Sequence, residues 1–108
     1  MKRNLFDEIP EELSEELFAV LAESEGVKIE RIVSDGHAST EGFWYDQEQN
    51  EWILLIAGSA TLSIEKETGI EQVELTLGDH LLIPAHQRHR VKSTSQTEKT
   101  IWLAVFFS

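Results

Sequence analysis

The sequence predicts a single all-β domain, closed or built of two antiparallel layers, behind a short N-terminal α-helix. Three observations support this fold class. A chain of 108 residues fits one compact domain. After Gly26, short runs of β-branched, aliphatic and aromatic residues alternate with turn residues as far as the C-terminus. Before Gly26, an acidic segment carries apolar residues at helical spacing. We therefore expect a helical segment over residues 1–26 and a β-barrel over residues 27–108.

The acidic segment predicts the helix. From Asp7 to Glu25 it holds 8 acidic residues and no Lys or Arg. Its apolar residues recur about every 3.6 positions, which is the repeat of an amphipathic helix; they are Leu13, Leu17, Phe18, Val20 and Leu21. Pro10 suits the first turn of a helix and Gly26 suits its end. The glutamates then form a solvated helix face, to which we assign no ligand.

Eight short strands are expected after the helix. They span Val27–Ser34, Gly42–Tyr45, Glu51–Ile56, Ala60–Glu65, Glu71–Leu75, His80–Ile83, His89–Ser93 and Thr100–Phe107, with turns at Gly58-Ser59, Thr68-Gly69 and Gly78-Asp79. An open sheet with this many strands leaves vulnerable edges, so a closed or two-layer arrangement is favoured.

Two of these strands are apolar on both faces, Trp52–Ala57 and Ile101–Phe107. Only one face of each can point into a barrel. The other face needs cover from a second layer or from a second copy of the chain. A two-fold related copy closes such a contact, so we predict a homodimer.

Composition excludes several classes of function. The chain has 20 acidic and 9 basic residues, a formal net charge of -11 that repels nucleic acids and anionic membrane surfaces. It has no cysteine, which rules out disulfides, thiolate metal sites and thiol nucleophiles. No apolar run is long enough to cross a bilayer and the start is polar, so a cytoplasmic location is the default expectation.

Two partial motifs carry chemistry. The segment from Gly78 to His89 resembles the second cupin motif, G-x5-P-x-G-x2-H-x3-N, with Gly78, Pro84 and His89 in their places. Upstream, Glu51 followed by six residues and Gly58 resembles the end of the first motif, G-x5-H-x-H-x(3 or 4)-E-x6-G. The chain is therefore similar to the cupin superfamily over residues 29–107.

This resemblance implies a jelly-roll barrel, the double-stranded β-helix, that holds one divalent metal ion. In the family, two histidines and a glutamate of the first motif and a histidine of the second converge on the metal. Position by position, His89 matches the second-motif histidine and Glu51 matches the glutamate. Imidazole and carboxylate together suit Fe, Mn, Ni, Co or Zn.

The chain departs from the family pattern where the first two histidines are expected. A four-residue gap before Glu51 puts Trp44 and Asp46 there, and a three-residue gap puts Tyr45 and Gln47 there. The usual second-motif glycine is His86. The candidate further metal ligands are Asp46, Gln47 and His86, and the candidate ligand-pocket residues are Tyr45 and Trp44.

Two kinds of function remain open. The first is a small single-domain cupin that binds a divalent metal and a small organic ligand, with oxygenase or isomerase chemistry if it is an enzyme. The alternative is a metal-free module that binds or senses a small molecule, or a structural dimerisation barrel. The missing first-motif histidines favour the metal-free alternative. Fold alone does not choose between them.

Overall fold

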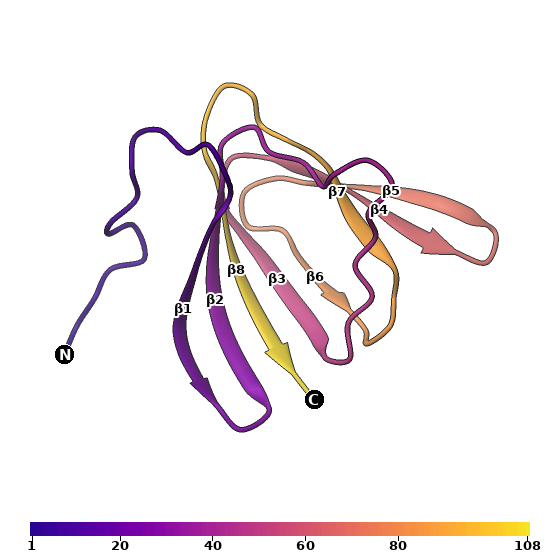
Figure 1. Cartoon of the computed structure of the whole chain (residues 1–108), viewed down its shortest axis with the longest axis horizontal. Coiled ribbons are helices and arrows are strands. Elements are labelled where there is room, and N and C mark those ends of the chain that lie inside the picture. The colour runs from indigo at the N-terminus through magenta and orange to yellow at the C-terminus, as the bar shows by residue number, and fades with distance from the viewer.

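The computed structural model describes all 108 residues and consists of two antiparallel β-sheets with no helix (Figure 1). The strands are β1 (Leu17–Ser24), β2 (Val27–Ser34), β3 (Asn50–Ala57), β4 (Ala60–Lys66), β5 (Gly69–Leu75), β6 (His80–Ile83), β7 (His89–Thr94) and β8 (Thr100–Phe107). One sheet has the order β1-β2-β8-β3-β6 and the other has the order β5-β4-β7. The predicted all-β, two-layer architecture is confirmed. No helix is present that is long and apolar enough to cross a membrane.

The predicted N-terminal helix is wrong. Its apolar part forms β1, which pairs antiparallel with β2 from Leu17 opposite Val33 to Ser24 opposite Val27. Gly26 has a φ of 78° and belongs to the tight turn that joins the two strands, so it ends no helix. An apolar run such as Leu17–Ala22 suits a strand as well as a helix, and pairing with a neighbouring strand outweighs the weak intrinsic preference.

Seven of the expected strands are present, and three of them have the expected bounds, β2, β6 and β8. The expected strand Gly42–Tyr45 is wrong, because only Tyr45 pairs there, through an isolated bridge to His89. The Tyr45 amide donates to the His89 carbonyl at 2.7 Å, and the His89 amide donates back at 3.2 Å. Gly42 has a φ of 83°, outside the range of a regular strand.

The core lies between the two sheets, and β3 is central to it. This strand pairs with β8 on one side and with β6 on the other. Glu51, Ile53 and Leu55 are buried, whereas the alternate residues are only partly covered. The core residues are Ile53, Leu55, Ala60, Leu62, Leu75, Ile83, Trp102, Ala104 and Phe106. The alternation therefore carries the Glu51 carboxylate towards the interior, on the same side as the core side chains.

The segment before β1 is attached to β2. The Arg31 guanidinium donates through Nη1 to the carbonyl oxygens of Leu5 at 2.9 Å and Asp7 at 2.7 Å. Arg31 and Val33 are buried although they alternate with the inward residues of β2. The N-terminal segment thus covers part of the outer face of the five-stranded sheet.

Candidate functional site

A cavity of about 620 Å³ opens into the barrel, and strands of both sheets contribute to its lining. Its volume is in the range of sites that hold small organic molecules. The apolar part of the lining consists of Phe18, Ile32, Ile53, Leu62, Ile83, Val91, Trp102 and Phe106. Several of these side chains also belong to the core, so the cavity extends to the packed interior.

Two of the predicted site residues, Glu51 and His89, meet inside this cavity. Nε2 of His89 lies 3.4 Å from Oε1 of Glu51, and the two side chains are only 6% and 10% exposed, respectively. Nδ1 of His89 lies 2.8 Å from the carbonyl oxygen of Gln87. A carbonyl only accepts, so Nδ1 carries the hydrogen. Nε2 is therefore the ring atom that is directed at Glu51 and is available to a ligand.

Tyr45 adds a hydroxyl group to the same place. Its ring stacks on the His89 imidazole, with centroids 5.3 Å apart, and it lines the cavity. Burial raises the pKa of the Tyr45 phenol above its usual value, and the negative charges of Glu16, Glu51 and Glu30 raise it further. The phenol is therefore a neutral hydrogen-bond donor at physiological pH.

Sequence reasoning missed three carboxylates in the cavity lining, those of Glu16, Glu30 and Glu48. Glu16 was assigned to a solvated helix face. It precedes β1 instead, and Ser34 Oγ donates to it at 2.5 Å. Glu30 lies within β2 and is buried, with Lys28 Nζ 3.6 Å from its Oε2. A charged residue between the apolar positions of a strand was the available signal for Glu30.

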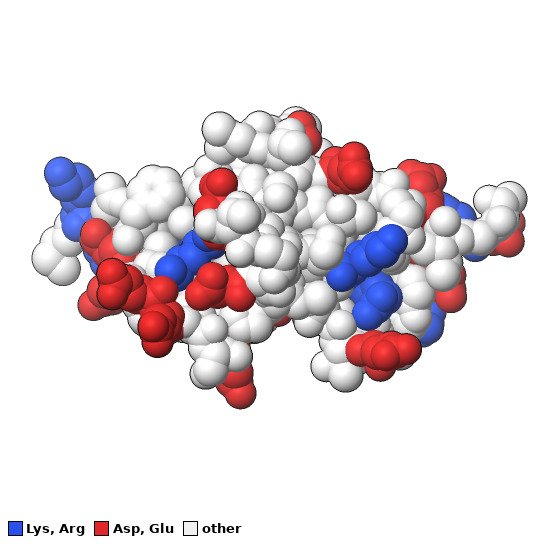
Figure 2. Space-filling model, turned by 90° about the horizontal axis from the view of Figure 1, so that it is seen from above, with Lys and Arg blue, Asp and Glu red and all other residues white.

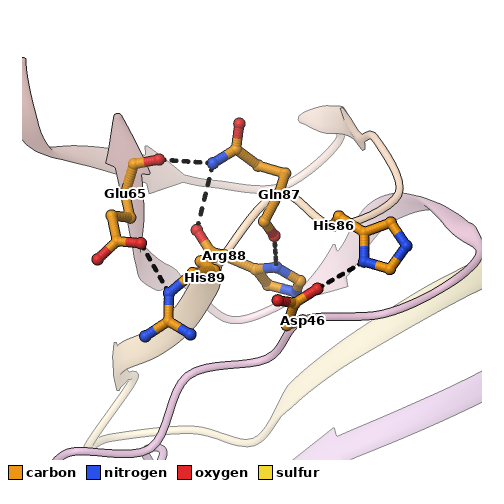
Figure 3. A network of polar contacts seen from close by, with 6 residues as sticks. All are labelled: Asp46, Glu65, His86, Gln87, Arg88 and His89. Carbon is orange, nitrogen blue, oxygen red and sulfur yellow. Dashed lines mark hydrogen bonds and ion pairs between the residues drawn. The ribbon is translucent and has the colours of Figure 1, made fainter. Parts of the chain in front are cut away.

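Asp46 and His86 lie elsewhere, on the surface. Nδ1 of His86 is 2.8 Å from Oδ1 of Asp46, their side chains are 67% and 45% exposed, and neither lines the cavity (Figure 3). His86 has a φ of 63°, a left-handed conformation that glycine adopts most easily. This conformation explains why the corresponding motif position is normally glycine.

Gln47 and Trp44, the remaining predicted residues, differ in position. Gln47 lines the cavity, and its carbonyl accepts from the His86 amide at 2.7 Å. Trp44 does not line it; its ring faces the guanidinium groups of Arg88 and Arg90, 5.7 and 6.0 Å away. Trp44 therefore belongs to the outside of the barrel, beside Arg88 of the preceding loop and Arg90 of β7.

A polar network holds Gln87, and through it the orientation of His89 (Figure 3). The Gln87 side chain donates to the carbonyl of Glu65 at 2.6 Å and to that of Arg88 at 3.4 Å. Arg88 Nε in turn donates to the Glu65 carboxylate at 2.7 Å. The loop before β7 is thus fixed to β4, which keeps the Gln87 carbonyl beside the imidazole.

The donor set does not fit a resident metal centre by itself. No three His, Asp or Glu side chains gather in a way that could hold a metal ion. Within the cavity, Glu51 and His89 are the two residues of the expected set whose side chains approach each other, whereas metal sites in proteins typically use about three or four protein ligands. Of the residues at the positions of the missing histidines, Trp44 cannot ligate and Asp46 is paired with His86 outside the cavity, whereas Tyr45 and Gln47 line the cavity.

Comparisons with known proteins agree with the fold. The family model described as Cupin domain matches residues 32–106. A solved structure from Ralstonia eutropha JMP134, provisionally named a mannose-6-phosphate isomerase, is 44% identical with a TM-score of 0.91, and the match covers 100% of this chain and 98% of that chain. No curated protein matches the chain in sequence.

Two more distant structures show likeness of fold alone. A cupin superfamily protein from Desulfitobacterium hafniense DCB-2 is 20% identical with a TM-score of 0.73, over 92% of this chain and 83% of that chain. A structure of Fe(II)-HppE with an alternative substrate is 12% identical with a TM-score of 0.72, over 92% of this chain and 53% of that chain. The structural neighbours of the chain thus include an iron protein.

Proposed function

Because the chain belongs to the cupin family, we propose that its barrel binds a small organic molecule in the cavity beside Glu51 and His89. The observation that carries this proposal is a buried acid–imidazole pair at a cavity whose lining combines apolar side chains with polar ones. Binding sites for small molecules combine apolar walls with a few oriented polar groups in this way. As the sequence predicts, we expect this function to be exercised in the cytoplasm.

The polar groups of the cavity have unused hydrogen-bonding capacity. Glu51 accepts no hydrogen bond from the protein, and Nε2 of His89 has only its 3.4 Å approach to Glu51. A buried polar group without a good partner is costly, so a ligand that supplies partners gains affinity. The Tyr45 hydroxyl is a third group that such a ligand can contact.

The name of the Ralstonia protein does not transfer directly to this chain. The cavity lining contains four glutamates and one lysine, a setting that disfavours a phosphate group. We therefore propose binding without a commitment to isomerase or oxygenase chemistry. If catalysis takes place, Glu51, His89 and Tyr45 are neighbouring titratable groups of the cavity that could move a proton.

A thermal-shift screen of diverse small molecules tests the proposal. We expect some compounds to raise the melting temperature of the wild type and to lose this effect when the cavity is filled by Val91→Phe. Ile32→Phe is a second filled variant, because either substitution alone could disturb folding; far-UV circular dichroism monitors the fold. Compounds that stabilise the wild type and both folded variants equally would place binding outside the cavity and contradict the proposal.

A metal-bound state is the second candidate. One observation favours it: a histidine that donates through Nδ1 to a carbonyl and directs Nε2 at a carboxylate has the orientation common among metal-ligating histidines. Glu51 and His89 would then hold a divalent ion that needs further donors from a ligand or water. Elemental analysis of protein purified without chelators or nickel resin should give stoichiometric metal, lost in His89→Ala; metal-free wild type would contradict this candidate.

A further inference from the structure

We infer that the cavity selects organic cations, small molecules that carry an ammonium group next to an apolar body. This inference rests on the proposed function, since it names the class of ligand that the cavity takes. It follows from the charges of the lining, the burial of two carboxylates, and a lysine that already occupies the same setting.

The cavity lining is strongly acidic. Its charged residues are Glu16, Glu30, Glu48, Glu51 and Lys28, which leave a net charge of -3 while His89 is neutral. The acids come from four places in the chain: the segment before β1, strand β2, the loop before β3, and β3 itself. Tyr45 experiences three of them together, because the charges of Glu16, Glu51 and Glu30 all raise the pKa of its phenol. Their fields therefore overlap inside the cavity.

Two of these carboxylates belong to side chains that are largely buried and line the cavity. The side chains of Glu30 and Glu51 are each 10% exposed, and neither accepts a hydrogen bond from the protein. Lys28 Nζ lies 3.6 Å from Oε2 of Glu30, whereas the group nearest to Glu51 is the uncharged Nε2 of the neutral His89 ring, 3.4 Å from its Oε1. A ligand that fills the cavity removes water from these carboxylates, which is costly unless the ligand itself pairs with them. A positively charged ligand would relieve this cost, and an anionic ligand would increase it.

The arrangement suits an organic cation better than a bare metal ion. The acids do not gather closely enough to hold a metal ion. An alkylammonium compound is larger, can lie among separated carboxylates, and buries its body against Ile53, Leu62 and Trp102 on the cavity wall. Charge attraction and apolar contact then act on one molecule.

The ammonium group of Lys28 already lies between an aromatic ring and a carboxylate of the cavity lining. Its Nζ lies 4.9 Å from the centre of the Phe106 ring and 3.6 Å from the Glu30 carboxylate. Both Phe106 and Glu30 line the cavity. An aromatic face and a carboxylate together form a favourable environment for an ammonium group.

The molecule as a whole favours the approach of a cation. Its formal net charge is -11. Figure 2 shows acidic atoms gathered towards the side where the N-terminus lies, with basic atoms in small patches between acidic ones. A field of one sign raises the local concentration and the association rate of oppositely charged ligands.

Three probes with one apolar body test the inference: 3-phenylpropylamine, 3-phenylpropan-1-ol and 3-phenylpropanoate, titrated calorimetrically at neutral pH and low salt. We expect the amine to bind at least about tenfold more tightly than the alcohol, and the carboxylate to bind most weakly. Glu51→Gln and Glu16→Gln should each weaken amine binding several-fold and leave alcohol binding nearly unchanged. Glu67→Gln removes the same charge from an exposed turn residue outside the cavity and should change neither.

The outcomes separate this inference from the proposed function. Equal affinity for the amine and the alcohol, or tighter binding of the carboxylate, would overturn the inference while binding in the cavity stands. The same would follow if both cavity variants kept wild-type affinity for the amine. If none of the three probes binds at millimolar concentration, both the proposed binding of small molecules in the cavity and the preference for cations are overturned for molecules of this size.

Discussion

The ring of Tyr45 stacks on the imidazole of His89, with their planes inclined by 22° and their centroids 5.3 Å apart. The two residues also exchange backbone hydrogen bonds in both directions. Tyr45 comes from a long loop, so this double attachment to β7 is what places its hydroxyl in the cavity beside the Glu51–His89 pair. Loop and barrel therefore form one site.

The Tyr45 phenol should titrate above the ordinary tyrosine pKa of 10.0, because burial and then Glu16, Glu51 and Glu30 disfavour the phenolate. Tyr45 is the only tyrosine of the chain, so phenolate absorbance reports it directly. Glu16→Gln should lower the pKa towards its usual value, whereas Glu67→Gln should not. A wild-type phenol that ionises at or below the usual pKa would refute the placement of these carboxylates.

The same shift affects stability at high pH. The unfolded chain loses the phenol proton at a lower pH than the folded chain does, so the stability contribution is complete below pH 10.0 and is lost as pH rises through the raised folded pKa. We expect the free energy of unfolding, measured with denaturant, to fall more steeply above this pH in the wild type than in Tyr45→Phe. Parallel pH profiles for the two proteins would contradict the shift.

Gly58 should tolerate no side chain. Its φ is 80°, and a Cβ atom there would lie 2.7 Å from the Thr100 Cα and 2.8 Å from the Lys99 carbonyl oxygen. Gly78 is a matched control, because it has a φ of 87° but open space around it. We expect Gly78→Ala to cost about 1 kcal/mol of unfolding free energy and Gly58→Ala clearly more. Equal losses in denaturant titrations would show that the close approach of β8 does not matter.

The outer face of the five-stranded sheet supports the predicted homodimer. Trp52 pairs with Leu82 of β6 and Val105 of β8, and these partly exposed apolar residues share that face. We propose that a second copy covers them. Light scattering should give about twice the chain mass of 12.3 kDa, and Trp52→Glu should shift the protein towards monomer.

Ile70→Glu serves as the control for this substitution, because Ile70 is an exposed apolar residue on the other sheet. It should leave the dimer intact. A wild type that stays monomeric at high micromolar concentration would end the dimer proposal.

The strands of the barrel could be predicted because the residues of each strand, and the turn residues beside it, are typical of β-structure. Val27–Ser34 and Thr100–Phe107 are rich in β-branched and aromatic residues and end at polar or turn residues, and both have the predicted bounds. The stretch Leu17–Ala22 lacked such information, because its apolar residues satisfy both periodicities. Its partner strand β2 decided the outcome, and strand pairing is not visible in a local pattern.

Some residues of the candidate site could be predicted from the sequence and others could not. Glu51 and His89 stand at fixed places in a motif, and the structure brings them together. Asp46 and His86 were candidates only because of their positions relative to the motifs. Asp46 lies in a loop and His86 has a left-handed backbone conformation, and their side chains pair with each other at the surface. Glu16 lines the cavity because the segment that follows it forms strand β1. A helix at that position places Glu16 on a solvated face, so the helical prediction concealed its position in the cavity.

The measurement that tests the central claim most directly is a protein-detected NMR screen of small organic molecules against isotope-labelled protein. If the cavity is a binding site, compounds that bind should shift the backbone amides of Tyr45, Glu51 and His89 and of their neighbours on β3 and β7. The same compounds should shift none of these amides in a folded Val91→Phe variant. Shifts confined to the outer sheet face or the N-terminal segment, or no shifts with any compound, would contradict the account.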